Sequence, residues 1–270
     1  EVAAQLNSLK DSPELRSRAN YILGRLDEED QNWPEAIKHY LQATGGDEFG
    51  KASQRIASIS LAIESVDKAL ERLENLRANH PEQASYIYQL EAEILRKEAR
   101  YQQGYDLLSE ALSTNTDSEE LRYARSLFSE RLGNIDAVEH DLQHIISRDP
   151  DNATALNALG YSLANLDPSR LDEAELLVKR ALELEPNDPA IIDSYGWIML
   201  LKGNISEAVS LLEKAFKQTQ DHEIAAHLGE ALWLSGDQAR AKLVWQEGLK
   251  DTPNSPIIMD TLRKLGLFNE

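Results

Sequence analysis

A pattern of small and bulky apolar side chains recurs along the whole chain. In each copy, a bulky apolar residue stands four positions after a small residue, and another small or apolar residue stands three positions further on. The first members of successive copies are 33, 35, 34, 36, 34 and 33 residues apart. Spacings of four and three place side chains on one face of a helix, so the pattern predicts seven helices at a regular period. The copies are Ala36, Tyr40 and Ala43; Ala69, Leu73 and Leu76; Gly104, Leu108 and Ala111; Val138, Leu142 and Ile145; Ala174, Val178 and Ala181; Ala208, Leu212 and Ala215; and Ala241, Trp245 and Gly248.

A second set of signals indicates an earlier helix and a turn in each unit. Small residues let two helices cross closely, while Gly followed by Asn or Asp tolerates the left-handed backbone of a tight turn. Pro ends one unit and suits the start of the next. The earlier helix is marked by Leu23-Gly24, Leu159-Gly160, Tyr195-Gly196 and Leu228-Gly229, the turn by Gly133-Asn134, Gly203-Asn204 and Gly236-Asp237, and the unit ends by Pro81, Pro150, Pro186 and Pro253.

This pattern resembles the tetratricopeptide repeat, a helix–turn–helix unit of about 34 residues. The resemblance implies an all-α fold, a right-handed tetratricopeptide-repeat superhelix or α-solenoid of about seven helix pairs plus a C-terminal capping helix. The expected repeats span approximately 14–46, 47–81, 82–116, 117–150, 151–186, 187–221 and 222–254. Residues 1–13 are expected to form the second helix of a truncated repeat, which suggests that the native protein continues upstream. Residues 255–270 are expected to cover the last repeat.

The first helix of each repeat is expected to line the inner face of such a solenoid, where binding specificity resides. Trp197 directly follows Gly196 at the helix crossing, so it faces the groove, and Tyr161 and Glu230 hold the same register. Exposed aromatic side chains on this face would be natural peptide anchors, whereas the alternative is that they pack between neighbouring repeats. The predicted partner-binding strip consists of Asn157, Tyr161, Asn165, Asp193, Trp197, Leu201, Glu230, Trp233 and Leu234.

The remaining tryptophans and the basic residues refine this picture. Trp245 occupies the bulky position of the repeat pattern and Trp33 precedes Ala36 by three residues, so both are predicted to be structural. Some proteins of this type hold the C-terminus of a peptide with a clamp of Lys, Arg and Asn. Between residues 157 and 234 the inward registers contain no Lys or Arg, which disfavours a cochaperone of that kind.

Composition and charge narrow the function classes further. The formal net charge is −19, and an acidic chain repels phosphate backbones, so no nucleic-acid partner is expected. The chain has no Cys, which excludes disulfides, thiolate metal sites and a Cys nucleophile. No apolar run approaches the roughly 20 residues that span a bilayer. No phosphate-binding loop and no Ser, His and Asp constellation is evident, so we predict a protein that is not an enzyme and has no metal or cofactor.

One short string imitates a catalytic motif. Gly45-Gly46-Asp47-Glu48-Phe49 matches the signature of enzymes that make cyclic diguanylate, in which it occupies a hairpin of an α/β domain. Here it lies between two helical patterns, at the junction of two repeats. We therefore predict that its glycines end one helix, that Asp47 caps the next, and that Phe49 packs between them. A nucleotide cyclase is the alternative from a different function class.

Two histidine pairs are candidate metal ligands. His222 and His227 are five residues apart, which separates them by about 140° around a helix, so they cannot share a metal ion. His140 and His144 are four residues apart and could chelate one, but no third ligand is evident. A solvated helix face is the preferred interpretation of this second pair.

A more specific resemblance begins at Asn157-Ala158-Leu159-Gly160-Tyr161, continues through Tyr195-Gly196-Trp197 and reaches Leu228-Gly229-Glu230. These segments resemble the C-terminal half of outer-membrane tetratricopeptide lipoproteins of Gram-negative bacteria. Members of that group are adaptors for a periplasmic carboxyl-terminal processing protease, to which they bring cell-wall hydrolases.

This resemblance implies a non-enzymatic scaffold with protein partners, namely the protease and its cell-wall hydrolase substrates. It also implies a periplasmic location, with outer-membrane attachment only through an N-terminal lipid anchor that is absent from this chain. The alternative among binding proteins is an assembly factor for a secretion or pilus machine.

Overall fold

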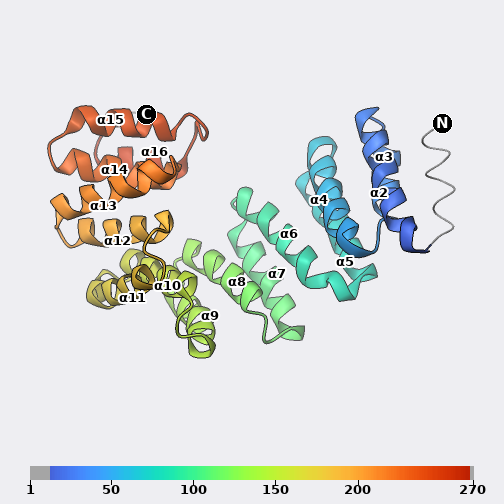
Figure 1. Cartoon of the computed structure of the whole chain (residues 1–270), viewed down its shortest axis with the longest axis horizontal. Coiled ribbons are helices and arrows are strands. Elements are labelled where there is room, and N and C mark those ends of the chain that lie inside the picture. Colours follow the sequence, from blue (N-terminus) through green and yellow to red (C-terminus); the bar gives the residue numbers. More distant parts are fainter. Residues whose placement is uncertain (1–12, 268–270) are drawn as a thin grey trace. The chain divides into compact units, whose positions relative to one another are not determined.

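The computed structural model describes residues 13–267, which fold into α-helices and two short 3-10 helices without any strand (Figure 1). The prediction of an all-α repeat fold is therefore confirmed. Residues 1–12, to which the helix of a truncated repeat was assigned, and residues 268–270 lie outside this description. The helices pair as α2 (Pro13–Glu29) with α3 (Trp33–Tyr40), α4 (Gly46–Ile63) with α5 (Val66–Asn79), α6 (Ala84–Lys97) with α7 (Tyr101–Thr114), α8 (Glu119–Arg131) with α9 (Ile135–Arg148), α10 (Ala153–Leu166) with α11 (Leu171–Leu184), α12 (Pro189–Leu201) with α13 (Ile205–Gln218), and α14 (His222–Leu234) with α15 (Gln238–Gly248), followed by α16 (Pro256–Lys264).

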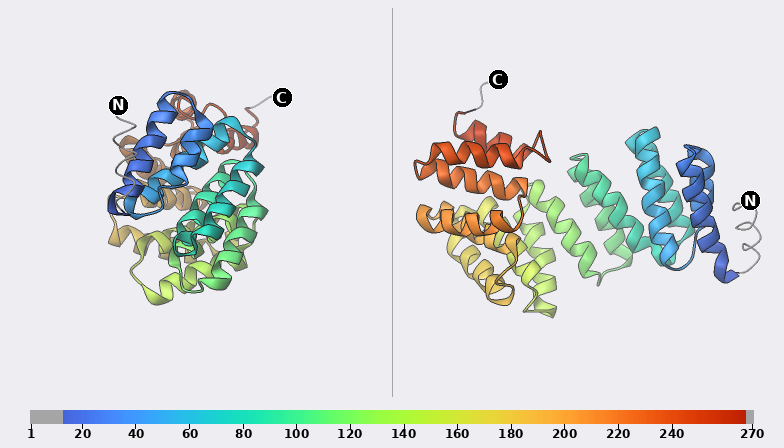
Figure 2. Two further views of the ribbon diagram at one scale, coloured as in Figure 1. Left: turned by 90° about the vertical axis from the view of Figure 1, so that its right-hand side faces the viewer. Right: turned by 45° about the horizontal axis from the view of Figure 1, so that its top comes forward.

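The chain divides into two compact units, residues 1–128 and residues 129–270. The boundary falls inside α8, and each unit is described by itself below. Within the units the helices lie side by side in the pairs α2–α3, α4–α5, α6–α7, α10–α11, α12–α13 and α14–α15, as the further views in Figure 2 also show. None of the helices in the described part of the chain is both long enough and apolar enough to cross a membrane.

The core of each repeat forms where its two helices cross. Every residue of the seven-copy pattern is buried, and all lie on the second helix of their repeat except Ala43, which follows the end of α3. The glycines opposite allow a very close approach. A Cβ atom at Gly160 would lie 2.6 Å from Val178 Cγ2, and one at Gly196 would lie 2.7 Å from Leu212 Cγ. No side chain fits between these helices, which is why glycine stands at the crossing.

The turns between paired helices also follow the sequence signals. Gly133, Gly203 and Gly236 have φ values of +70°, +83° and +95°, a left-handed conformation that glycine adopts without strain. Asp237 then caps α15, because its carboxylate accepts a hydrogen bond from the backbone N–H of Arg240. The longer connection after α10 contains the 3-10 helix Pro168–Arg170.

The junction at residues 45–49 differs in part from the prediction. Helix α3 already ends at Tyr40, so the glycines do not end it. Gly45 is instead the N-cap of α4, and Asp47 lies within its first turn rather than capping it. Because Gly45 has no side chain, the hydroxyl group of Ser17 bonds both its N–H and its carbonyl group at 2.9 Å. Phe49 is buried as predicted, with its ring centroid 5.2 Å from that of His80.

In the second unit, the first helices form the inner side of a curved stack. Helix α10 contacts α12, and α12 contacts α14, whereas no comparable contact joins α11 to α13 or α13 to α15. The first helices therefore lie closer to one another than the second helices do. The face made by α10, α12 and α14 is consequently the concave face of this unit, and it carries the predicted strip.

Candidate functional site

The predicted strip lies on three neighbouring first helices and divides into a buried and an accessible part. Asp193 and Glu230 are buried, at 6% and 5% exposure. Leu201, which stands one turn after Trp197, is 36% exposed, and Leu234, which stands one turn after Glu230, is 49% exposed. Tyr161, Trp197, Trp233 and Asn157 are half-buried, and Asn165 is exposed. The strip is thus an apolar and aromatic surface built over a buried polar centre.

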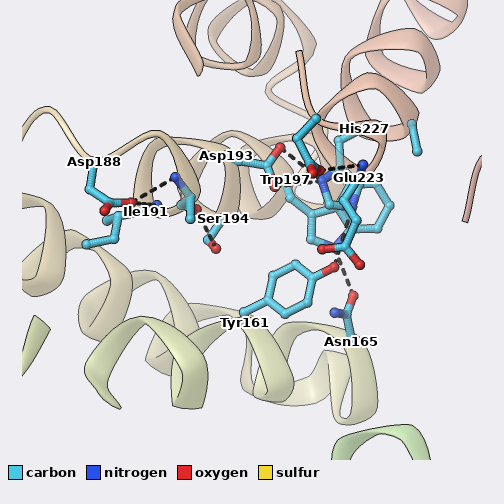
Figure 3. A network of polar contacts seen from close by, with 12 residues as sticks. Tyr161, Asn165, Asp188, Ile191, Asp193, Ser194, Trp197, Glu223 and His227 are labelled. Carbon is cyan, nitrogen blue, oxygen red and sulfur yellow. Dashed lines mark hydrogen bonds and ion pairs between the residues drawn. The ribbon is translucent and has the colours of Figure 1, made fainter. Parts of the chain in front are cut away.

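His227 of α14 is the centre of the buried part (Figure 3). Its Nδ1 atom lies 2.9 Å from Oδ2 and 3.0 Å from Oδ1 of Asp193 on α12. The Trp197 ring stacks on the imidazole, with centroids 4.4 Å apart and planes inclined by 23°. Tyr161 of α10 completes the cluster, because its hydroxyl oxygen lies 3.5 Å from Nε2 of His227. One buried histidine therefore joins the first helices of three repeats.

Electrostatics favour the charged form of this histidine. Burial by itself lowers the pKa of His227, but the charge and hydrogen bond of Asp193, with smaller contributions from Glu223 and Glu230, raise the pKa above its ordinary value. Both ring nitrogens of an imidazolium are donors, so Nδ1–H donates to Asp193 and Nε2–H faces the Tyr161 oxygen. Burial raises the pKa of Tyr161 well above its usual range, which keeps the phenol neutral.

Two ion pairs flank the cluster, and their cations come from outside residues 157–234. Lys264 of α16 places Nζ 2.6 Å from Oε1 of Glu230 and 5.6 Å from the centroid of the Trp197 ring. Arg131 of α8 places Nη2 3.2 Å from Oε1 of Glu223. Neither cation could be predicted from the inward registers of residues 157–234, because Lys264 and Arg131 belong to flanking helices. The register does contain a signal for Lys264, which stands 34 residues after Glu230.

The accessible part of the strip is ordered by contacts of the tryptophans. Trp197 Nε1 donates to Oδ1 of Asn165 over 2.8 Å. Because an indole nitrogen is only a donor, this bond directs the Asn165 oxygen toward Trp197 and leaves its NH₂ group for other acceptors. Trp233 packs on the core residue Trp245, with ring centroids 6.0 Å apart. Trp197 therefore packs against side chains of neighbouring repeats, Trp233 packs within its own repeat, and both stay half-buried. Their role as peptide anchors stays a prediction.

The histidine pairs have separate partners. His222 Nδ1 lies 2.9 Å from the Ser255 hydroxyl oxygen, whereas His227 faces Asp193. His140 is largely exposed, and His144 is half-buried. Among the residues that the structure describes, no group of three or more His, Cys, Asp or Glu side chains could hold a metal ion. Sequence reasoning rejected His227 as a metal ligand and did not identify its place at the centre of the strip.

Comparison with known proteins places these observations in a family. Family models described as tetratricopeptide repeat match residues 130–189 and 165–232. The chain is built of tetratricopeptide repeats. Together the matches cover residues 130–232, which include the strip as far as Glu230. The first half of the chain is recognised as repeats by its period and its fold.

Individual relatives agree with this assignment. A TPR repeat-containing protein of Pseudomonas aeruginosa is 39% identical over 212 residues, covering 78% of this chain and 36% of that protein. A solved tetratricopeptide-repeat protein of Parabacteroides merdae has a TM-score of 0.69 at 15% identity, covering 92% of this chain and 97% of that one. PilW, described as a widely conserved type IV pilus biogenesis factor, has a TM-score of 0.58 at 17% identity, covering 80% and 100%. The chain thus spans about a third of the Pseudomonas relative, and the two structures show a common fold.

Proposed function

We propose that the chain is a non-enzymatic scaffold that binds a protein partner through the concave strip of its second unit. Tetratricopeptide-repeat proteins mediate protein–protein interaction. The observation that supports this strip is the half-buried pair Trp197 and Trp233 beside the exposed Leu201 and Leu234. Aromatic side chains held rigid by neighbours and surrounded by aliphatic ones are typical anchors of protein interfaces.

The finer proposal is that of a periplasmic adaptor, attached to the outer membrane in the full-length protein. It would bind a carboxyl-terminal processing protease and present cell-wall hydrolases to it. The support is the resemblance of the segments around Tyr161, Trp197 and Glu230 to outer-membrane lipoproteins, together with the relative from Pseudomonas aeruginosa, a Gram-negative bacterium. The absence of an enzyme activity, of a cofactor and of a nucleic-acid partner stays a prediction.

A second candidate is an assembly factor for a pilus machine. It is favoured by the structural likeness to PilW over 80% of this chain, which by itself shows a shared fold. The two candidates differ in the proteins that a capture experiment should yield. A protease with a cell-wall hydrolase supports the adaptor, whereas pilus or secretion components support the assembly factor.

Replacing both exposed leucines of the strip, Leu201→Ser with Leu234→Ser, is expected to weaken partner binding about tenfold or more, since anchors near an interface centre contribute most of its affinity. Both side chains are accessible in the free protein, so stability should change little. The measurement is quantitative capture of partners from a periplasmic extract, followed by titration of the purified partner. Trp197→Ala, which also removes the indole from His227, should weaken binding in the same way.

The chain offers a matched control for this experiment. Leu176 and Leu243 are exposed at 70% and 64%, but they lie on the second helices α11 and α15. The pair Leu176→Ser with Leu243→Ser makes the same chemical change away from the strip and should leave capture unchanged. Equal loss in both double variants, or unchanged capture in the first, would show that the partner uses another surface.

A further inference from the structure

The contact between Lys264 and the strip has the chemistry of a cation-binding site. The Glu230 carboxylate is buried, with 6% of its side chain exposed, and Lys264 Nζ lies 2.6 Å from it. The same ammonium group lies 5.6 Å from the Trp197 ring centroid, within the range of a cation–π interaction. A carboxylate beside an aromatic face is an arrangement that binds a lysine or arginine side chain from any source.

The cation that fills this site is only loosely held by the rest of the protein. The Lys264 side chain is 59% exposed although its ammonium group reaches a buried acid. It belongs to α16, the last helix of the described chain, and Lys264 is the last residue of that helix. A long side chain at such a position can withdraw into water without disturbing the core, because lysine stems are flexible and their heads are readily hydrated.

We propose that Trp197 and Glu230 form a subsite for a basic side chain of the partner, and that Lys264 occupies this subsite in the free protein. The inference rests on the proposed function of the strip and names the chemistry of its ligand. The partner segment has one lysine or arginine that displaces Lys264. Its apolar neighbours lie on Leu201 and Leu234, one helical turn further along α12 and α14. The formal net charge of −19 favours a basic segment over an acidic one.

Competition within the chain has a consequence that a purely structural ion pair does not have. Removing Lys264 frees the subsite, so a basic ligand should bind more tightly to Lys264→Met than to the unaltered chain. When the subsite is free of Lys264 only part of the time, the apparent affinity for a ligand equals the intrinsic affinity multiplied by the fraction of the protein whose subsite is free. We expect a gain of about threefold to tenfold, because Lys264, whose side chain is 59% exposed, has to leave the subsite before the ligand binds.

The probe is a synthetic nine-residue peptide with a central lysine between leucines, compared with versions that carry norleucine or glutamate at the centre. Binding is followed by tryptophan fluorescence and by calorimetry at low ionic strength. Lys250→Met is the matched control, because Lys250 is exposed and its ion pair is with the nearby Glu247. It removes the same charge away from the strip. The lysine peptide should gain affinity for Lys264→Met alone, the norleucine peptide should not, and Glu230→Gln should abolish the preference for lysine.

Several results would overturn the proposal. The first is that the lysine peptide gains no affinity for Lys264→Met, or gains as much for Lys250→Met. The second is that the lysine peptide binds neither the unaltered chain nor Lys264→Met. The third is that the glutamate peptide binds best and that its binding is lost in Lys264→Met. If Lys264→Met does not fold, NMR of ¹³C-labelled lysine in the unaltered chain gives the answer. Displacement moves the Lys264 ε-carbon signal to that of a free lysine, whereas an unmoved signal contradicts exchange. Partner capture by the leucine variants is a separate readout, so the proposed function and the subsite can fail independently.

Discussion

Gly229→Ala is expected to lower the free energy of unfolding by about 2 kcal/mol. A Cβ atom at this position would lie 2.0 Å from Nε1 and 2.4 Å from Cε2 of Trp245, distances that atoms cannot adopt. Trp245 is only 3% exposed and closely packed, so the rigid indole has no free space to enter. Overpacking of this kind costs about 1–3 kcal/mol, and the better helix propensity of alanine offsets up to about 1 kcal/mol of it.

A different glycine provides the control for this variant. Gly50 lies inside α4, where an added Cβ would meet Tyr86 Cζ at an ordinary 3.5 Å. Gly50→Ala should therefore be neutral or stabilise the protein by about 0.5–1 kcal/mol through helix propensity. Both variants are compared by urea unfolding followed by circular dichroism. A stabilised Gly229→Ala protein would show that the crossing of α14 and α15 is looser than described.

A compensating change tests the physical reason. At the register of Gly229, 12 residues before the first pattern residue, the second and third repeats have Ala57 and Ala92, and their bulky positions hold Leu73 and Leu108. Adding Trp245→Leu to Gly229→Ala reproduces that combination. The double variant should lose less stability than the two single changes predict by addition, because alanine now faces a smaller side chain. Simple additivity would contradict the clash.

Asp193→Ala is expected to cost about 3 kcal/mol at pH 6 and clearly less at pH 9. Removing one partner of a buried ion pair leaves the other charge uncompensated. In the unaltered protein the pKa of His227 is raised, so its stabilising contribution is fully present below the unfolded pKa of about 6.5 and is lost as the pH rises through the folded pKa. Without Asp193, burial disfavours the imidazolium, and the variant is least stable where the ring must carry a charge.

The measurement is the difference in unfolding free energy between the two proteins from pH 6 to pH 9. Taking a difference matters because burial also raises the pKa of Glu91, in the first unit, to about 7, and its contribution cancels in the comparison. Asp172→Ala is the control, since the Asp172 side chain is 93% exposed beside Lys202 and such pairs contribute about 0–1 kcal/mol. A loss for Asp193→Ala that is equal at both pH values would show that His227 is neutral in the folded protein.

The repeat pattern explains how much of the fold could be predicted from the sequence. Helix crossings depend on residues at fixed spacings within one repeat, such as Gly196 and Leu212, and those spacings are visible in the sequence. The exposed leucines and tryptophans of the strip follow from the same register. The prediction for Gly45 was wrong because this N-cap depends on a distant residue. The hydroxyl group that bonds to it comes from Ser17, 28 residues away, and no signal near Gly45 in the sequence indicates that contact.

The sequence by itself determined that this protein is a stack of helix pairs and which face of each first helix looks inward, because both follow from periodicity along one chain. Only the tertiary structure decided that His227 lies under Trp197 and that Lys264 reaches Glu230. These contacts join side chains from different repeats, and their distances depend on how successive pairs pack and curve. A charged cluster of this kind has no period of its own in the sequence, and it is visible only once the helices that carry its members lie side by side.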